Sequence, residues 1–351
     1  MGNILSLAKR DHVDFSLRPF SETDGLIFSW FSYYKFPQKF EEGIPLSELK
    51  GENVFADGEM YRDCFLRAKS KRFFKALCRN PRFKDVLISD FDLVEKQRER
   101  FSATCFTLPT GELVMVFRGT DPSFDCWREI FGLAYREEIP SQKYAKLYFD
   151  RILKKYPNKN FYVCGYSKGG NLASYVTLNA TEDQRSRILG LYCYDSPALQ
   201  TETAYPCPSF SVKKYVPQSS FVGMLFEKTQ NFTVIKSASL SLLQHVPFSW
   251  VIKDGTFLLA KKQTKSSVRV ERAFNRWVKE LPIEHRERFV DLIYNALDGL
   301  KTHDFNVVLS TMPVQMLNLL GIYMALPKEE RSFFCDTVKQ LLHNYVRERA
   351  V

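Results

Sequence analysis

Residues 161–173 read FYVCGYSKGGNLA: an apolar run, a glycine-rich turn around Ser167 and the start of a helical pattern. The turn contains G-x-S-x-G, and a strand before it with a helix after it is the context of a nucleophile elbow. The backbone of an elbow turns so tightly that the residues two positions before and after the serine must be small, as Gly165 and Gly169 are. The stretch predicts that Ser167 is a catalytic nucleophile. A glycine-rich turn inside an α/β sheet is the alternative.

Two backbone N–H groups near this turn are candidates for an oxyanion hole. A helix that begins after Ser167 directs its first N–H groups and its dipole at the serine, so the N–H of Lys168 is one expected donor. A second donor should come from the loop after an earlier strand, and the apolar run 114–117 leads into Gly119 and Thr120. Glycine allows a close approach of the backbone to a substrate. Thr120 would then supply its backbone N–H as a donor, and its hydroxyl could be a further donor.

Two further expectations concern the residues around this loop. Arg118 is expected to make a structural ion pair. Large apolar side chains follow the loop and could form a lid or an acyl pocket, although an ordinary core is the other interpretation. These side chains are Phe124, Trp127, Ile130 and Phe131.

A serine nucleophile needs a base, and the chain has five histidines. In hydrolases of this architecture the order along the chain is nucleophile, acid, histidine, which excludes His12. His285, His303 and His343 lie in a charged helical region and are expected at the surface. His245 follows the last strand candidate in a loop, where its imidazole could accept the serine proton. A structural loop histidine is the alternative for this residue.

The acid of the site is open between two carboxylates. Asp195 ends the apolar run 191–194, and parallel sheets place functional groups at the C-terminal edge of their strands. The next strand candidate, 212–216, is followed by no carboxylate until Glu227. We favour Asp195, with Glu227 as the second candidate. Asp195 could equally cap a turn before the Ser-Pro pair that follows it.

Strand and helix patterns alternate from residue 101 onward, which indicates a mainly parallel sheet built from βαβ units and flanked by helices. A helical N-terminal region is predicted over residues 1–100, an α/β-hydrolase core over 101–262 and a helical C-terminal region over 263–351. Strands are expected at 103–107, 113–117, 161–164, 189–194, 212–216 and 232–235, and helices at 20–31, 67–79, 141–155 and from 168.

The composition limits the classes of protein that the chain can represent. It has 351 residues, of which 45% are hydrophobic and 30 are Phe, so it can bury a large core and is not intrinsically disordered. Its apolar runs are far shorter than the ~20 residues of a membrane-spanning helix. The formal net charge is +10. Such an excess fits a nucleic acid, an anionic membrane or an anionic substrate as partner, or serves solubility alone.

The N-terminus and the cysteines bear on the compartment. The first residues lack the layout of a signal peptide. None of the eight cysteines forms a C-x-x-C pair, and several lie in apolar runs, which suits a reducing environment. A cytoplasmic location is the expectation. Gly2 with Ser6 fits a short myristoylation pattern, and an ordinary N-terminal arm is the other reading.

Several motifs together resemble the Mbeg1-like family, a group of α/β-hydrolases related to class 3 lipases. The resemblance implies a serine-hydrolase fold in which Thr120 belongs to the oxyanion loop and Ser167 and His245 are catalytic. Class 3 lipases carry their acid just before a Val-Pro pair, where this chain has Lys214 and Tyr215. This departure favours Asp195 as the acid. The motifs lie at 20–24, 117–121 with Trp127, 165–173, 195–197, 216–224 and 244–250.

The sequence thus predicts a serine hydrolase of the carboxylesterase or lipase type that needs no cofactor or metal. An ester or lipid is the expected substrate, and peripheral contact with an anionic membrane is a further expectation. No nucleic-acid partner is expected, because no recognised binding motif accompanies the charge. The alternatives are a catalytically silent hydrolase-like fold used for binding or membrane association, and an acyltransferase built on the same elbow.

Overall fold

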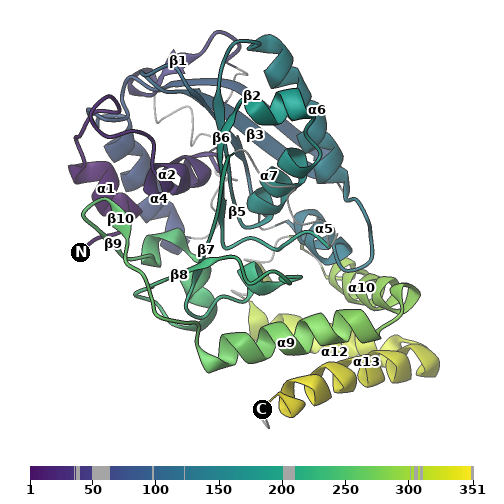
Figure 1. Ribbon diagram of the computed structural model, residues 1–351. Helices are drawn as coiled ribbons and strands as arrows, with labels where there is room; N and C mark the ends of the chain where they lie inside the picture. The colour runs from purple at the N-terminus through teal and green to yellow at the C-terminus, as the bar shows by residue number, and fades with distance from the viewer. Residues whose placement is uncertain are drawn as a thin grey trace.

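The computed structural model describes residues 1–34, 36, 40–49, 64–96, 99–121, 123–200, 210–300, 302–303, 307–308 and 311–348. In this part of the chain a central sheet is flanked by helices on both faces, and further helices lie below it in Figure 1. The predicted α/β-hydrolase-type fold, a mainly parallel sheet with N- and C-terminal helices, is confirmed.

Eight strands form this sheet in the order in which they follow one another in the sequence. From β1 to β4 each strand is antiparallel to the next, and from β4 to β8 each strand is parallel to the next. The strands are β1 (Ile44–Pro45), β2 (Leu87–Lys96), β3 (Glu99–Thr107), β4 (Leu113–Phe117), β5 (Phe161–Tyr166), β6 (Ile188–Tyr194), β7 (Ser211–Pro217) and β8 (Thr233–Ile235). Parallel strands end at the same edge of a sheet, so the C-terminal ends of β4 to β7 lie together.

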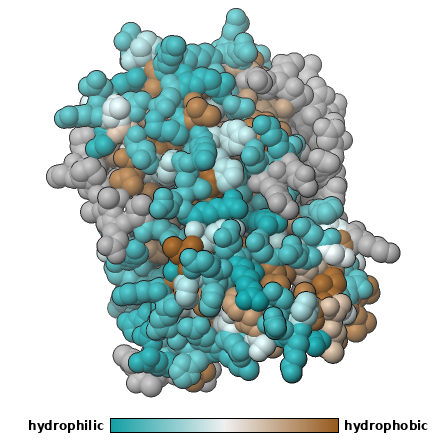
Figure 2. Space-filling model, turned by 90° about the vertical axis from the view of Figure 1, so that its right-hand side faces the viewer, coloured by the Kyte–Doolittle hydropathy of each residue, from teal (hydrophilic) through white to brown (hydrophobic). Residues whose placement is uncertain are grey.

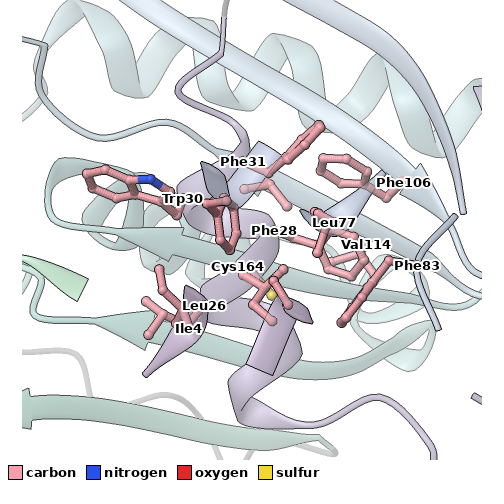
Figure 3. Close-up of a cluster of buried hydrophobic side chains, with 14 of the residues drawn as sticks. Ile4, Leu26, Phe28, Trp30, Phe31, Leu77, Phe83, Phe106, Val114 and Cys164 are labelled. Atoms are coloured by element: carbon pink, nitrogen blue, oxygen red, sulfur yellow. The ribbon is translucent and has the colours of Figure 1, made fainter. Parts of the chain in front are cut away.

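One face of the sheet is covered by α1 (Ile4–Arg10), α2 (Glu22–Phe31) and α4 (Cys64–Leu77). Figure 3 shows the aromatic core on this face, where Phe28 and Phe31 of α2 meet Phe106 of β3. A capping box at Ser21 and Asp24 starts α2. The helices predicted at 20–31 and 67–79 are therefore present as α2 and α4.

The other face is covered by α6 (Pro140–Lys155) and α7 (Lys168–Leu178). Strand β4 supplies both cores: Val114 and Val116 pack on the face of α2, and Leu113, Met115 and Phe117 on the opposite face. This alternation is the period of two that a strand imposes. Strand β4 is therefore buried on both faces, and the Gly119 loop begins just after its end.

The C-terminal region consists of helices. They are α9 (Lys265–Glu280), α10 (Ile283–Asp298), α12 (Met312–Ala325) and α13 (Lys328–Arg347), and α10 docks on α5 (Phe124–Gly132) of the core. An ion pair of 2.7 Å between Arg128 and Asp291 joins these two helices. Figure 2 shows hydrophobic side chains gathered at one corner of the lower part of the molecule, which these helices form in Figure 1. The exposed apolar residues of α12 are Met312, Val314, Met316, Leu317, Leu320 and Met324.

Smaller elements complete the described chain. They are α8 (Glu182–Ser186), the antiparallel pair β9 (Ile252–Lys253) and β10 (Thr256–Phe257), and the 3-10 helices η1 (Leu46–Glu48), η3 (Val222–Met224), η4 (Ser241–His245) and η5 (Pro247–Ser249). None of the helices in the described ranges combines the length and apolar character needed to cross a membrane.

The structure differs from the sequence prediction in the region before residue 100, which was predicted to be helical. The region 1–100 contains β1 and β2 as well as helices, and β2 pairs with β3 across that position. A bulge between Ser89 and Asp92, with Asp90 at φ 52°, interrupts the period-two pattern of β2. This interruption hides the strand from a periodicity search. The first helix of the C-terminal region, α9, begins at Lys265.

Candidate active site

Ser167 stands between the end of β5 and the first residue of α7. Its φ of 56° and ψ of −129° lie outside the regions that non-glycine residues prefer. Such backbone strain costs on the order of 1–3 kcal/mol and persists where the surrounding structure enforces it. The enforcing contacts include a hydrogen bond of 2.9 Å from the N–H of Ser167 to the carbonyl of Tyr194, and one of 3.0 Å from the N–H of Gly170 to the carbonyl of Ser167.

The two glycines of G-x-S-x-G are required by close backbone packing. A Cβ on Gly165 would lie 2.1 Å from the carbonyl atoms of Gly169, and a Cβ on Gly169 would lie 2.0 Å from the carbonyl oxygen of Phe117. In both cases the obstructing atoms are backbone, which cannot move aside as a flexible side chain does. The elbow therefore packs directly on itself and on the end of β4.

Ser167, His245 and Asp195 form one hydrogen-bonded chain. The Nε2 atom of His245 is 3.2 Å from the Oγ of Ser167, and its Nδ1 is 2.7 Å from Oδ2 of Asp195. The imidazole is 27% exposed, whereas the aspartate side chain is 1% exposed. The structure thus brings together the three residues that the sequence indicated as nucleophile, base and acid, with the imidazole accessible from solvent.

Asp195 follows β6 directly and is held in a fixed orientation. Its φ of 45° is unusual for a residue other than glycine, and its N–H donates to the carbonyl of Tyr215 at 2.8 Å. Its Oδ1 accepts hydrogen bonds from the hydroxyl of Ser220 and from the N–H of Gly223, the latter at 3.1 Å. A buried carboxylate needs such partners, and these leave Oδ2 directed at His245. Asp195 is therefore more than a turn cap.

His245 ends the 3-10 helix η4 and is supported by Tyr166. The hydroxyl of Tyr166 donates to the carbonyl oxygen of His245 at 2.7 Å. The two rings are also stacked, with centroids 4.8 Å apart and planes at 29°. The preceding residue, Gln244, accepts a hydrogen bond from the indole of Trp250 at its carbonyl, at 2.8 Å. Both contacts restrict the loop, so the imidazole is held at the serine.

Both predicted oxyanion residues border the nucleophile. Lys168 is the first residue of α7, where a backbone N–H has no acceptor within the helix. The loop of Thr120 packs on the elbow, because a Cβ on Gly119 would lie 3.2 Å from the Cβ of Ser167. The Thr120 hydroxyl is buried without a hydrogen-bond partner among the described residues. The oxyanion role of the two backbone N–H groups stays a prediction.

Arg118 makes the expected ion pair, with Nη2 3.5 Å from Oδ2 of Asp121. Asp121 also accepts hydrogen bonds from the N–H and hydroxyl of Ser123, the N-cap of α5. Burial alone would raise the pKa of Asp121, but Arg118 and Ser123 hold it below its ordinary value. The charged aspartate therefore ties the loop of Thr120 to the start of α5.

The side chain of Lys168 lies in a buried cluster behind the elbow. Its Nζ is 2.6 Å from Oε2 of Glu129, and the two side chains are only 1% and 3% exposed. The same Nζ donates to the carbonyl of Arg100 at 2.9 Å and is 3.1 Å from the Sγ of Cys126. Burial alone would lower the pKa of Lys168, but Cys126 and Glu129 raise it above its ordinary value. The ammonium group is thus charged and joins α7 to α5.

Glu227, the second acid candidate, has other partners. Its carboxylate is 2.7 Å from the Nζ of Lys214 and accepts a hydrogen bond of 2.7 Å from the hydroxyl of Thr229. His285, His303 and His343 are exposed, as expected. The structure therefore joins Asp195 to the imidazole of His245 and pairs Glu227 with a lysine.

A family model matches residues 77–295 of the chain and describes a family named Mbeg1-like. The match covers more than half of the chain. The chain belongs to the Mbeg1-like family. The resemblance noted in the sequence is confirmed, and the elbow, Asp195 and His245 all lie inside the matched segment of this Mbeg1-like chain.

Solved structures similar to this Mbeg1-like chain include lipases from fungi. The native propeptide complex of Rhizomucor miehei lipase matches at 16% identity and a TM-score of 0.32, over 44% of this chain and 58% of that one. A deletion mutant of that complex matches at 16% identity and a TM-score of 0.41, over 67% and 79%. Lip2 lipase from Yarrowia lipolytica matches at 12% identity and a TM-score of 0.31, over 51% and 72%. We found no match among the curated proteins.

The four apolar residues after the oxyanion loop do not form a lid in this Mbeg1-like structure. They lie on α5, where Phe124 is buried against α10 and Ile130 is also buried. Trp127 packs on the same cluster, and Phe131, 37% exposed, contacts the ring of Tyr294. Phe124 and Ile130 therefore belong to the core, and Trp127 and Phe131 border it where α10 packs on α5.

Three residues around the Mbeg1-like site carried no predicted role. Ser220 and Gly223 bind Asp195, and Tyr166 supports His245. Only the need of a buried carboxylate for donors could have pointed to the first two. The described residues include no cluster of His, Cys, Asp or Glu that could hold a metal ion.

Proposed function

We propose that this Mbeg1-like protein is a serine hydrolase that cleaves carboxylic esters, with Ser167 as nucleophile, His245 as base and Asp195 as orienting acid. The observation that carries the proposal is the hydrogen-bonded chain from Ser167 through His245 to Asp195 at 3.2 and 2.7 Å. The proposal is also supported by the strained elbow, the solvent-accessible imidazole and the buried aspartate, which suit acyl transfer by a serine.

The proposed reaction proceeds in two stages. In the first, Nε2 of His245 accepts the hydroxyl proton as Oγ of Ser167 bonds to the ester carbonyl carbon. The alcohol then leaves with that proton, and the acyl group remains on the serine. In the second stage, His245 removes a proton from water as the water oxygen bonds to the acyl carbon. The bond between that carbon and Oγ of Ser167 then breaks, the carboxylic acid leaves, and His245 returns the proton to Oγ. Asp195 keeps the proton on Nδ1 throughout and stabilises the imidazolium.

Negative charge on the carbonyl oxygen needs donors in both stages. The N–H groups of Lys168 and Thr120 are the proposed donors, because they flank the serine at the start of α7 and at the end of the β4 loop. Donors fixed before the reaction stabilise the transition state without reorganisation. The buried links from Lys168 to Glu129 and from Asp121 to Ser123 support this fixed geometry.

An apolar acyl group suits the surface beside the imidazole. Leu240, Leu242 and Leu243, just before His245, are 81%, 67% and 66% exposed. Exposed apolar side chains next to a reactive group favour an ester whose acyl part is apolar, since contact with it would remove them from water. This supports a carboxylesterase or lipase-type substrate.

The test is covalent labelling with a fluorophosphonate probe, together with hydrolysis of p-nitrophenyl esters of increasing chain length. The wild-type protein should be labelled and should hydrolyse the esters. Ser167→Ala should lose both activities, while the exposed-serine control Ser186→Ala should retain them. Absence of labelling and hydrolysis in folded wild-type protein would contradict the proposal and favour a non-catalytic binding role.

A further inference from the structure

Tyr33 reaches the active site from outside the segment that the family model matches. It follows α2 in a turn, where its N–H donates to the carbonyl of Trp30 at 3.2 Å. A Cβ on Gly119 would lie 2.1 Å from the phenol oxygen of Tyr33 and 3.2 Å from the Cβ of Ser167. The phenol oxygen and the nucleophile therefore approach the same point of the oxyanion loop.

The sequence suggested that Gly119 allows the backbone to approach a substrate, whereas the structure shows that it makes room for the phenol of Tyr33. The space that a side chain would fill at this position is occupied by the phenol oxygen and by the carbonyl of Tyr166, which would be 2.5 Å away. Glycine thus allows the hydroxyl of Tyr33 to lie directly against the loop that leads to Thr120. An alanine there would displace the phenol or the elbow.

The ring of Tyr33 is held by aromatic neighbours. It stacks on Trp30 with centroids 5.3 Å apart, and its centroid is 6.1 Å from that of Tyr166, which in turn stacks on His245. Figure 3 shows Trp30 on the same helix as Phe28 and Phe31, at one end of the buried aromatic cluster. The phenol is therefore presented by a packed element, as a preorganised donor must be.

A phenol supplies one O–H donor, and tyrosine hydroxyls serve as oxyanion donors in acyl transfer. We propose that the hydroxyl of Tyr33 is a third oxyanion donor, beside the N–H groups of Thr120 and Lys168, and contacts the carbonyl oxygen of the ester as it becomes charged. This inference rests on the proposed hydrolase function. It makes the turn that follows α2 part of the catalytic site.

The test compares Tyr33→Phe with the neighbouring control Tyr34→Phe. The hydroxyl of Tyr34 is buried and donates to the carbonyl of Ser70 at 2.6 Å, away from the oxyanion loop. Loss of one oxyanion donor lowers kcat by about 10²–10³-fold. Tyr33→Phe should therefore reduce kcat for a p-nitrophenyl ester by about that factor, with KM and melting temperature near the wild-type values. Tyr34→Phe should lower the melting temperature and leave kcat unchanged.

A second measurement separates catalysis from folding. The rate constant for fluorophosphonate labelling, measured on folded protein at a fixed temperature, should fall in Tyr33→Phe and not in Tyr34→Phe. Wild-type kcat and labelling rate in Tyr33→Phe would overturn the role of Tyr33 while the hydrolase proposal stands. A wild-type protein that neither reacts with the probe nor hydrolyses esters would refute the proposed function and this role with it.

Discussion

Replacing Asp195 with Asn changes one atom of the hydrogen-bonded chain. The Oδ1 position can still accept from Ser220 and from the N–H of Gly223, so those contacts fix the amide orientation. The amide nitrogen then replaces Oδ2, which is 2.7 Å from Nδ1 of His245. An NH₂ group donates, so Nδ1 must become the acceptor and the imidazole proton moves to Nε2.

The expected loss of activity follows from this change of tautomer. A protonated Nε2 cannot accept the proton of Ser167, whose Oγ lies 3.2 Å away. Enforcing the wrong tautomer in a serine–histidine–aspartate site costs roughly 10⁴-fold in kcat. At 1.36 kcal/mol for each factor of ten, this is about 5.4 kcal/mol of transition-state stabilisation. The side chain keeps its volume and two of its partners, so the melting temperature should change far less than kcat.

Glu227→Gln is the matched control, because Glu227 was the second acid candidate. It should lower stability by weakening the contact with Lys214, and kcat should stay near the wild-type value. The assay is p-nitrophenyl ester hydrolysis, normalised to the folded fraction from circular dichroism. A wild-type kcat in Asp195→Asn with a loss of about 10⁴-fold in Glu227→Gln would refute the assignment of the acid. Near-wild-type activity in both variants would refute the need for any carboxylate here.

Four further outcomes are expected. Lys168→Met should lower the unfolding free energy, measured in urea, by about 3–5 kcal/mol, because it leaves the buried carboxylate of Glu129 without Lys168. Adding Glu129→Leu should recover most of this loss, and equal stability of the single and double variants would contradict the reasoning. Gly165→Ala should abolish fluorophosphonate labelling and lower the melting temperature, because its Cβ meets backbone at 2.1 Å; normal labelling would count against the elbow packing. Burial alone would raise the pKa of Glu227, but Lys214 and Thr229 hold it below its ordinary value. The stability that this shift provides is present above the ordinary carboxyl pKa and is lost as the pH falls through the lowered pKa. Glu227→Gln should therefore reduce the fall in unfolding free energy at acid pH, and an unchanged fall would exclude the pair as its source. Binding to anionic vesicles should weaken with salt if the net charge of +10 directs the protein to membranes; salt-insensitive binding, or none, would leave the charge a solubility feature.

The sequence was most informative where structure depends on near neighbours. The elbow at Ser167 is such a case, since the glycines that it needs are two residues away on each side. The strands and helices of the core were also predictable. The central strands β4 and β5 are short apolar runs, and the helices that flank the sheet bury one face and show its period. Strand β2 was missed since Asp90 and Asp92 interrupt its apolar pattern at the bulge.

Contacts between distant segments were not predictable in the same way. Ser220 binds Asp195 across 25 positions, and Tyr33 reaches Gly119 from the turn after α2. No local period or motif encodes these contacts, because they arise only when the sheet aligns the ends of its strands. The packing of α5 was also not predictable. Its sequence allowed either a lid or a core position for the apolar residues, and only the contact with α10 in the structure distinguishes the two.

Asp195 and Glu227 both follow strands that end at the C-terminal edge of the parallel sheet, and their partners at that edge decide which of them reaches His245. Tyr194 of β6 pairs with Tyr215 of β7, so the residues after these two strands end at the same level, and a carboxylate from either strand could approach the imidazole. In this chain β7 carries Lys214, which draws Glu227 into an ion pair. The carboxylate at the end of β6, Asp195, is instead oriented by donors from the loop that follows β7. The segment after β7 therefore contributes to the site by holding the acid, which explains how a chain with a lysine before its Val-Pro pair can still present a carboxylate to His245.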